Sequence, residues 1–512
     1  MKRIRLAVGW LTVWCACTLA QTPLTLKDAV QRGVSQHPEI QSERLQVASE
    51  RQGIKLALGQ FDAKLKQEWS WRKSDTPTGS LLESPTGKIK ERAFNHRSAL
   101  EQALPRFGTQ LTLSYETNRT ANNNPFLSLN PFFTSRWQLE ARQPLWRNRR
   151  TDAARTELII RRQLAGLAET EFETRLLDFI GRIEQAYWTF ATARQTLAIA
   201  ADAVALAVSF KDSTVRQVNA GELARAEIAA AESELQRRQD MRLAQQAQVA
   251  EAENALKQLL ATQRNDALWQ ESLTLNEPLT DPSATLPNLD ETITTALQKR
   301  PELRALTQRL DLNETEQRLL AEQRKPQLDL TMTYGVQGLA GSLNTLPNPF
   351  GDNDAVPPAL RGGWGKSLAQ TGRQNYPTVQ IGLTLELPLR NRTADARLAQ
   401  NEFAAQRLTL QRAQIEQAII AQIRNALAAL ESARQRIGAA NLGTQAAQER
   451  LSSETRLYAN GESTSYFVLT RQNEFAEARR RLALAQLDGQ MATARLAQAT
   501  GLTLQRYQVS LQ

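Results

Sequence analysis

Two histidines and two cysteines are the residues of this sequence best suited to metal binding or nucleophilic catalysis. His37 and His96 lie far apart in the chain, and Cys15 and Cys17 both fall within the first 20 residues. A protein zinc site usually takes four ligands, or three with an open position. No glycine-rich phosphate loop follows a strand pattern, and no G-x-S-x-G nucleophile motif occurs. We therefore expect no enzyme, no cofactor and no metal site.

The charged residues indicate solvated helices. The 53 Asp and Glu alternate with 63 Lys and Arg, and the formal net charge is +10. Charges of both signs on one helical face are typical of an exposed surface, whereas a nucleic-acid site gathers basic residues on one face. We expect no nucleic-acid partner.

The first 20 residues have the pattern of an export signal. A basic start precedes an apolar run of about 15 residues, which is shorter than the roughly 20 residues that a membrane-spanning helix needs. Small residues before Gln21 suit a cleavage site, so 1–20 is predicted to be a signal peptide. Lipidation of Cys17 is an open alternative, although Trp14 stands where an aliphatic residue is usual.

The remaining chain repeats itself. The stretch LTLKDAVQRGVSQHPEI (24–40) aligns with PNLDETITTALQKRPEL (287–303), and QPLWRNRR (143–150) resembles LPLRNR (387–392). The elements recur in the same order, which indicates a duplication. The two predicted structural repeats cover 21–275 and 285–505.

Alternating apolar residues predict strands in both repeats. In VQIGLTLELPL (379–389) the apolar residues fall on one side, a pattern shared by membrane β-barrels and by soluble sheets with one solvated face. The export signal and the tryptophans near strand ends, as at a membrane interface, favour the barrel. The predicted strands are about 62–72, 135–146, 326–337 and 378–389. The predicted interface aromatics are Trp69, Trp71, Trp137 and Trp146.

Two stretches rich in turn formers, 74–135 and 337–377, are predicted to be long loops outside the cell. The first contains an additional hairpin pattern near 98–117. We expect this hairpin to project above the membrane; whether it joins the barrel wall is left open.

Long helices follow each pair of strands. Apolar residues recur at steps of three and four, and such a stripe must pack against another helix. A tract of about 68 residues would extend roughly 100 Å. The predicted helices are about 151–219, 222–262, 394–459 and 462–499.

Glycine interrupts these helices once in each repeat. Ala220-Gly221-Glu222 and Asn460-Gly461-Glu462 are predicted to be tight reversals, because glycine adopts positive φ without steric cost. We expect Glu222 and Glu462 in the first turn of the returning helices, where the helix dipole favours acids.

About four strands cannot close a barrel, since the smallest membrane barrels have about 8. An open edge would leave backbone groups unpaired in lipid. The sequence thus requires more than one copy of the chain and does not determine how many.

The duplicated opening, the two strand-to-helix junctions and the two tips resemble the outer membrane efflux protein (TolC) family over nearly the whole chain. The resemblance implies an α+β membrane protein: a homotrimer with a 12-stranded barrel in outer-membrane lipid and an α-helical coiled-coil periplasmic tunnel. It also implies an exit duct of a tripartite efflux or type I secretion system. Its tips would dock a periplasmic adaptor that links it to an inner-membrane transporter.

In that family, residues near the second tip narrow the tunnel at its periplasmic end. The positions implied here include no acidic ring, so closure by salt bridges is in doubt. Our hypothesis is that Phe467 and Tyr458 close the pore by apolar packing, with polar groups nearby; alternatively, Phe467 is buried between helices. The candidate constriction residues are Glu227, Tyr458, Ser463, Phe467 and Thr470.

A periplasmic coiled-coil scaffold or adaptor without a pore is the alternative function. It accounts for the helices but leaves four amphipathic strands unexplained. The substrate, the pump and the adaptor cannot be read from the sequence.

Overall fold

The computed structural model describes residues 21–79, 83–84, 86–277, 286–346 and 355–509, so the predicted signal peptide lies outside the described residues. The chain forms two compact units, which we describe separately. The sheet unit comprises 48–167 and 307–410. The helical unit comprises the described residues of 1–47, 168–306 and 411–512.

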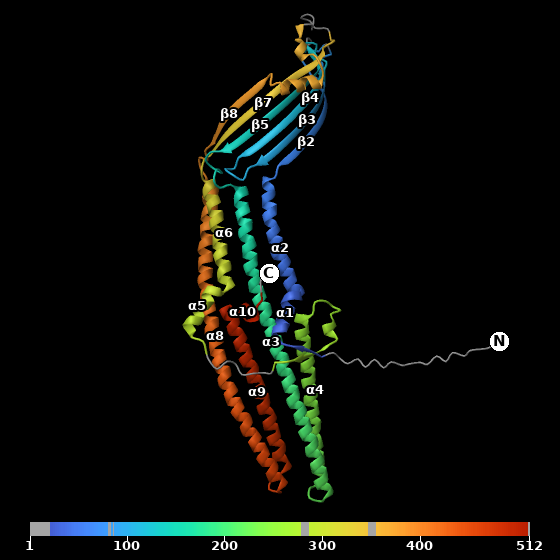
Figure 1. Ribbon diagram of the computed structural model, residues 1–512, viewed down its shortest axis with the longest axis vertical. Helices are drawn as coiled ribbons and strands as arrows, with labels where there is room; N and C mark the ends of the chain where they lie inside the picture. Colours follow the sequence, from blue (N-terminus) through green and yellow to red (C-terminus); the bar gives the residue numbers. More distant parts are fainter. Residues whose placement is uncertain (1–20, 80–82, 85, 278–285, 347–354, 510–512) are drawn as a thin grey trace, which may run out of the picture. The chain divides into compact units, whose positions relative to one another are not determined.

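The sheet unit is built on one antiparallel sheet whose strand order follows the chain, β2-β3-β4-β5-β7-β8 (Figure 1). Each strand pairs with its neighbours over most of its length. The strands are β2 (Lys64–Pro77), β3 (Lys88–Ala103), β4 (Gln110–Asn122), β5 (Leu129–Pro144), β7 (Gln327–Leu343) and β8 (Pro377–Glu386).

The expectation of about four strands per chain, with 74–135 as a loop and the 98–117 hairpin outside the sheet, is wrong. Strands β3 and β4 occupy much of that stretch and lie between β2 and β5, so the sheet has six strands. The apolar alternation of β3 is weak, because charged and amide residues fill most of its positions. Its membership in the sheet depends on pairing with neighbours, which local periodicity does not reveal.

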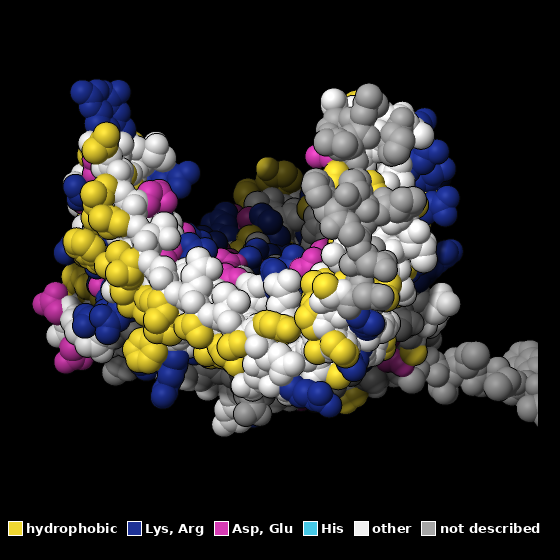
Figure 2. Space-filling view, turned by 90° about the horizontal axis from the view of Figure 1, so that it is seen from above, with side chains coloured by type: hydrophobic (Ala, Val, Ile, Leu, Met, Phe, Trp, Pro, Cys, Tyr) yellow, Lys and Arg dark blue, Asp and Glu magenta, His cyan; other side chains and the backbone are white. Residues whose placement is uncertain are grey.

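The sheet has one apolar and one polar face. Seen from above, hydrophobic side chains follow the outside of a curved wall and charged side chains gather in its hollow (Figure 2). On β7 the apolar side chains recur from Leu328 to Val336. Those eight residue steps cover roughly 26 Å along the strand, close to the height of about 25 Å of the apolar band of outer-membrane barrels.

A short helix covers the end of β7 that extends beyond β8. Helix α7 (Trp364–Gly372) follows η4 (Pro358–Leu360), so the predicted loop 337–377 is partly helix and strand. The Ser367 hydroxyl donates to the Gly338 carbonyl at 3.0 Å, and the Gln370 side chain accepts from the Leu339 amide at 2.9 Å. These bonds satisfy backbone groups that would otherwise form an open strand edge.

The helical unit repeats one arrangement. Helices α1 (Leu26–Gln36) and α5 (Leu289–Lys299) have the same length and lie at the same offset in the two repeats. The strands β1 (Gln21–Leu24) and β6 (Ser272–Leu275) pair in parallel. Further α-helices among the described residues are α2 (Pro38–Leu58), α3 (Ala153–Asn219), α4 (Ala226–Leu260), α6 (Pro301–Gln323), α8 (Arg392–Ala459), α9 (Ser465–Thr500) and α10 (Thr503–Tyr507).

Each repeat has its own core. In the first, α3 buries Ile183 with aromatic neighbours such as Phe179 and Tyr187 against α1. In the second, α8 buries Ile423 and Ile419 in a smaller cluster with α5 and α9. Burial of such aliphatic side chains supplies the main stabilising contribution, about 1.5–3 kcal/mol each.

Helix α3 is the one helix among the described residues that is long and apolar enough to cross a bilayer by length and composition. Its stretch 196–210 instead packs against other helices. Val204 and Ala207 are buried with Leu235, and Asp202 forms an ion pair with Arg479 at 2.7 Å. This packing accounts for the apolar run without a membrane.

Candidate functional site

The two helix reversals have the same backbone geometry. Gly221 has φ 82° and Gly461 has φ 80°, both in the left-handed region. The Glu222 amide donates to the Gln217 carbonyl at 2.9 Å, and the Glu462 amide donates to the Leu457 carbonyl at the same distance. Both glycines therefore end a helix in the way that the sequence predicts.

The predicted location of Glu222 and Glu462 in the returning helices is wrong. Helix α4 begins at Ala226 and α9 at Ser465, so both glutamates lie in the turns. Thr464, the N-cap of α9, has an extended backbone, so this helix begins only at Ser465. The acid in the first turn of α4 is Glu227, and the first turn of α9 has none.

Tyr458 joins helices within the chain. Its hydroxyl donates to the Gln217 side chain at 2.9 Å, and its ring lies 5.8 Å from that of Phe210. It packs on a cluster of Phe210, Ala231 and Val468. Burial raises the pKa of the Tyr458 hydroxyl, so the group stays neutral at physiological pH. Its position suits a residue that holds the tip together.

Polar contacts surround the tips, and several of these residues were missed from the sequence. Ser465 donates to Glu227 at 2.5 Å, and Ser463 donates to Glu454. Arg471 lies 3.7 Å from Glu454 and 2.8 Å from Glu474. The positions implied by the family resemblance carry no acidic ring, but neighbouring positions form ion pairs. Glu454, Arg471 and Glu474 each lie four residues from a candidate constriction residue, and this helical spacing could have identified them from the sequence.

Phe467 is 47% exposed and its neighbour Tyr466 is 70% exposed, so burial of Phe467 between helices of its own chain is wrong. The two rings meet edge to face at 5.6 Å. Thr470 donates to the Tyr466 carbonyl at 2.8 Å and serves its own helix. Tyr466 was not singled out from the sequence, although the adjacent aromatic pair was visible there.

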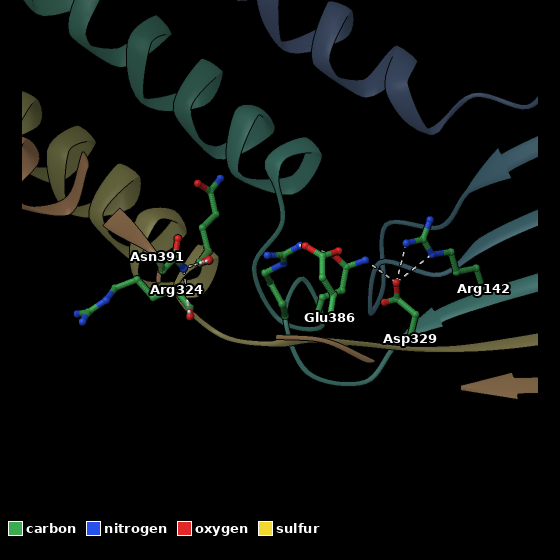
Figure 3. Close-up of polar contacts among 8 residues, drawn as sticks. Arg142, Arg324, Asp329, Glu386 and Asn391 are labelled. Atoms are coloured by element: carbon green, nitrogen blue, oxygen red, sulfur yellow. Dashed lines mark hydrogen bonds and ion pairs between the residues drawn. The ribbon is translucent and has the colours of Figure 1, made fainter. Parts of the chain in front are cut away.

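Polar contacts lie at the strand-to-helix junctions of the sheet unit (Figure 3). Arg142 of β5 pairs with the buried Asp329 of β7 at 2.6 Å. The Asn391 amide donates to the carbonyls of Gln323 and Arg324 at 3.3 and 3.5 Å, and so ties the start of α8 to the end of α6. A cleft of about 670 Å³ lies beside these residues. Asn391 of the second junction motif is therefore structural, because its side chain bonds the backbone at the end of α6.

The predicted interface tryptophans flank the apolar rows. Trp69 stacks on His96 at 5.3 Å, and Trp137 meets Tyr115 at 4.8 Å, on the apolar face. Trp71 is 67% exposed on β2, and Trp146, 50% exposed, follows β5 at the opposite end. Aromatic residues at both limits of an apolar band are typical of a membrane-embedded sheet. Within the described residues, no group of three His, Cys, Asp or Glu side chains could hold a metal ion.

The fold is shared with solved outer-membrane proteins. The chain is 15% identical to the outer membrane protein VceC from Vibrio cholerae, with a TM-score of 0.62 over 93% of this chain and 96% of that one. For the CmeC outer membrane channel of Campylobacter jejuni the identity is 14% and the TM-score 0.61, over 93% and 85%. For the open state of the MtrE outer membrane channel of Neisseria gonorrhoeae they are 15% and 0.62, over 93% and 89%.

No curated protein matches the chain by sequence. Residues 292–502 match the family described as Outer membrane efflux protein. These residues include the second core and the second tip. The chain thus has the fold of solved outer-membrane channels, and residues 292–502 are similar to the outer membrane efflux protein family.

Proposed function

We propose that this protein is the outer-membrane exit duct of a tripartite efflux or type I secretion system, and that it conducts substrates passively. The observation that supports this most is the sheet with one apolar face and two open edges, joined in sequence to helices of 67 and 68 residues. At about 1.5 Å per residue each helix extends roughly 100 Å, long enough to reach far into the periplasm.

The open edges require further copies of the chain. Strands β2 and β8 each have one neighbour in the sheet, and an edge in lipid leaves backbone amides and carbonyls unpaired. A homotrimer closes these edges around one lumen. The charged side chains in the hollow of the wall would face water, and the apolar rows would face lipid (Figure 2).

The tips would bind a periplasmic adaptor. Gly221 and Glu222 are exposed in the first tip, and Gly461 and Glu462 in the second. The equal turns in both repeats present similar backbone surfaces, which suits an adaptor that contacts both kinds of tip. An inner-membrane transporter would supply the energy, so the duct itself needs no catalytic group.

Near the tips, Phe467 with Tyr466 would narrow the tunnel. Both rings are exposed in the single chain, whereas Tyr458 is held against Gln217 and Phe210. We therefore assign the apolar constriction to the exposed pair and a positioning role to Tyr458. Glu227 and Ser463 form polar contacts nearby, whereas Thr470 bonds within its own helix.

The Phe467→Ala variant tests the constriction. We expect a several-fold larger single-channel conductance in planar bilayers and increased antibiotic leakage into cells, because the lost ring widens the narrowest point. Met241→Ala removes another exposed apolar side chain, on α4, and serves as the control. Unchanged conductance in Phe467→Ala would show that Phe467 is not part of the constriction.

The channel itself is tested apart from its constriction. A duct sediments with outer membranes, needs detergent, migrates as a trimer and restores dye efflux in a strain that lacks it. A periplasmic scaffold would instead be released in the soluble periplasmic fraction as a protein that forms no conducting pore. That second result would contradict the proposal.

A further inference from the structure

We propose that β3 and β4 are part of the membrane wall, so that the assembled barrel has eighteen strands instead of twelve. The inference rests on the proposed trimeric channel: three copies of a six-stranded sheet contribute eighteen strands. It changes the width of the outer end of the duct and therefore the solutes that this end can hold.

The pairing of the hairpin is continuous. Strand β3 pairs with β2 from Lys64↔Glu101 to Pro77↔Lys88, without a register shift. Strand β4 pairs with β3 from Gln110↔Ala103 to Asn122↔Glu91, and with β5 from Gln110↔Arg142 to Thr120↔Phe132. A hairpin that projected above the membrane would leave β2 and β5 to pair with each other, and they do not.

The hairpin also continues an apolar row of its neighbours. One row of directly paired residues crosses all six strands, and every member is exposed in the single chain. The row is Leu65, Leu100, Leu113, Leu139, Tyr334 and Val379. Because paired residues in adjacent strands point to the same face, this row forms one apolar stripe that suits lipid.

The adjacent row is polar on every strand and points to the other face. Its members are Lys64, Glu101, Thr112, Glu140, Thr333 and Gln380. On the same face, Lys66 pairs with Glu101 at 2.8 Å and Arg72 pairs with Glu91 at 2.8 Å across β2 and β3. Charged pairs of this kind belong on a water-filled side, so this face of β3 suits the lumen.

The edges that meet a second copy are therefore β2 and β8. Strand β2 has 14 residues and β8 has 10, long enough to span an apolar band at the usual tilt. Antiparallel pairing of β8 from one copy with β2 of the next would continue the alternation of strand directions.

The diameter of a barrel grows roughly linearly with its strand number, so eighteen strands give a lumen about one and a half times as wide as twelve. Barrels of 16–18 strands leave an aqueous channel. The outer end of this duct would thus admit bulky polar solutes, and size selection would fall to the tips. The strand count therefore predicts the width of the lumen, although it does not identify the substrate.

Spin labels on introduced cysteines test the inference in the reconstituted, full-length protein. Leu113→Cys and Thr112→Cys on β4 are compared with Leu139→Cys and Glu140→Cys, the matched pair on β5. Collision with oxygen, which concentrates in lipid, should be high for both leucine positions. Collision with a water-soluble nickel chelate should be high at Thr112 and Glu140. Equal nickel access at positions 112 and 113 would place the hairpin outside the membrane and overturn the inference.

A direct strand count by electron cryomicroscopy in lipid nanodiscs is the second measurement, and it needs no substitution. Eighteen strands around one lumen are expected, and twelve would overturn the inference. A trimer that conducts ions with twelve strands would leave the proposed function standing. A closed barrel of eighteen strands that neither conducts nor restores efflux would contradict the function and leave the strand count intact.

Discussion

The two repeats of this chain share their cores and tips but differ in how they connect their strands. In the first repeat, β2 reaches β5 through the added hairpin β3–β4. In the second, β7 pairs directly with β8, and helix α7 packs on the end of β7. The helix pairs α1–α2 and α5–α6 keep a constant offset. The helix pairs that bury apolar surface are thus alike in the two predicted repeats, whereas the connections between strands differ.

The tips show the same division on a smaller scale. Gly221 and Gly461 have nearly equal φ values. At the offset that aligns them, Glu227 in the first tip corresponds to Phe467 in the second. The backbone reversal is common to both repeats, whereas the side chains assign an acid to one tip and an aromatic pair to the other. Substitutions at equivalent positions separate what is shared from what is specific.

The largest effect is expected in the cores. Ile183→Ala and Ile423→Ala each remove a fully buried side chain, at a cost of about 2–5 kcal/mol. Ile183 should cost more, because its cluster contains more aromatic neighbours that cannot collapse onto the cavity. Thermal unfolding in detergent, followed by circular dichroism, measures both. A larger loss for Ile423→Ala would contradict the ranking of the two cores.

Next comes the connection of the second repeat. A Cβ atom at Gly338 would lie 2.0 Å from the Ser367 carbonyl oxygen, so Gly338→Ala must push α7 away, at about 1–3 kcal/mol. At Gly382, on β8, nothing lies within 4 Å, and Gly382→Ala is the matched control. Protease cleavage within 358–372 should accelerate in the first variant alone. Equal cleavage in both variants would show that the packing of α7 does not depend on the close contact between Gly338 and the Ser367 carbonyl.

The ends of the returning helices provide a pH test. After α4, Asp266 accepts hydrogen bonds from the Thr262 and Leu268 amides, and with Arg32 nearby these hold the pKa of its carboxyl at about 2. The stability it contributes is present above its usual value of 3.8 and is lost as pH falls toward 2. Asp266→Asn should cost about 1–2 kcal/mol at pH 7.

The difference between Asp266→Asn and the unsubstituted protein should shrink below pH 3. Gly501, which ends α9 at φ 72°, supplies the comparison in the second repeat. Gly501→Ala should destabilise by about 1 kcal/mol at every pH, because its effect is a backbone strain. Denaturation midpoints measured between pH 2 and pH 7 distinguish the two. A cost of Asp266→Asn that persists unchanged at pH 2 would argue against the carboxylate as its origin.

The smallest effect is expected at the tips. A Cβ at Gly221 or Gly461 meets nothing within 4 Å, so alanine at either position adds only the cost of positive φ, about 1 kcal/mol. Equal losses in thermal stability would support equivalent turns. A loss at one tip only would show that its backbone is held by contacts that the other lacks.

Patterns that repeat locally could be predicted from the sequence. The long helices, the glycine reversals and four of the strands follow from periodicity and from the conformational freedom of glycine. The resemblance to a family added the channel and its location. Strand β3 escaped this reasoning because its charged residues hide the alternation, and the exposure of Phe467 escaped it because helical spacing does not tell which face of α9 is covered.

By itself, the sequence predicted a duplicated chain, and it determined that the helices are long and that each pair reverses at a glycine, since these last two features depend on neighbours along the chain. Only the tertiary structure decided that the hairpin completes a six-stranded sheet and that Tyr458 is half-buried while Phe467 stays exposed. Those outcomes depend on pairing and packing between segments distant in sequence, which local residue patterns do not encode.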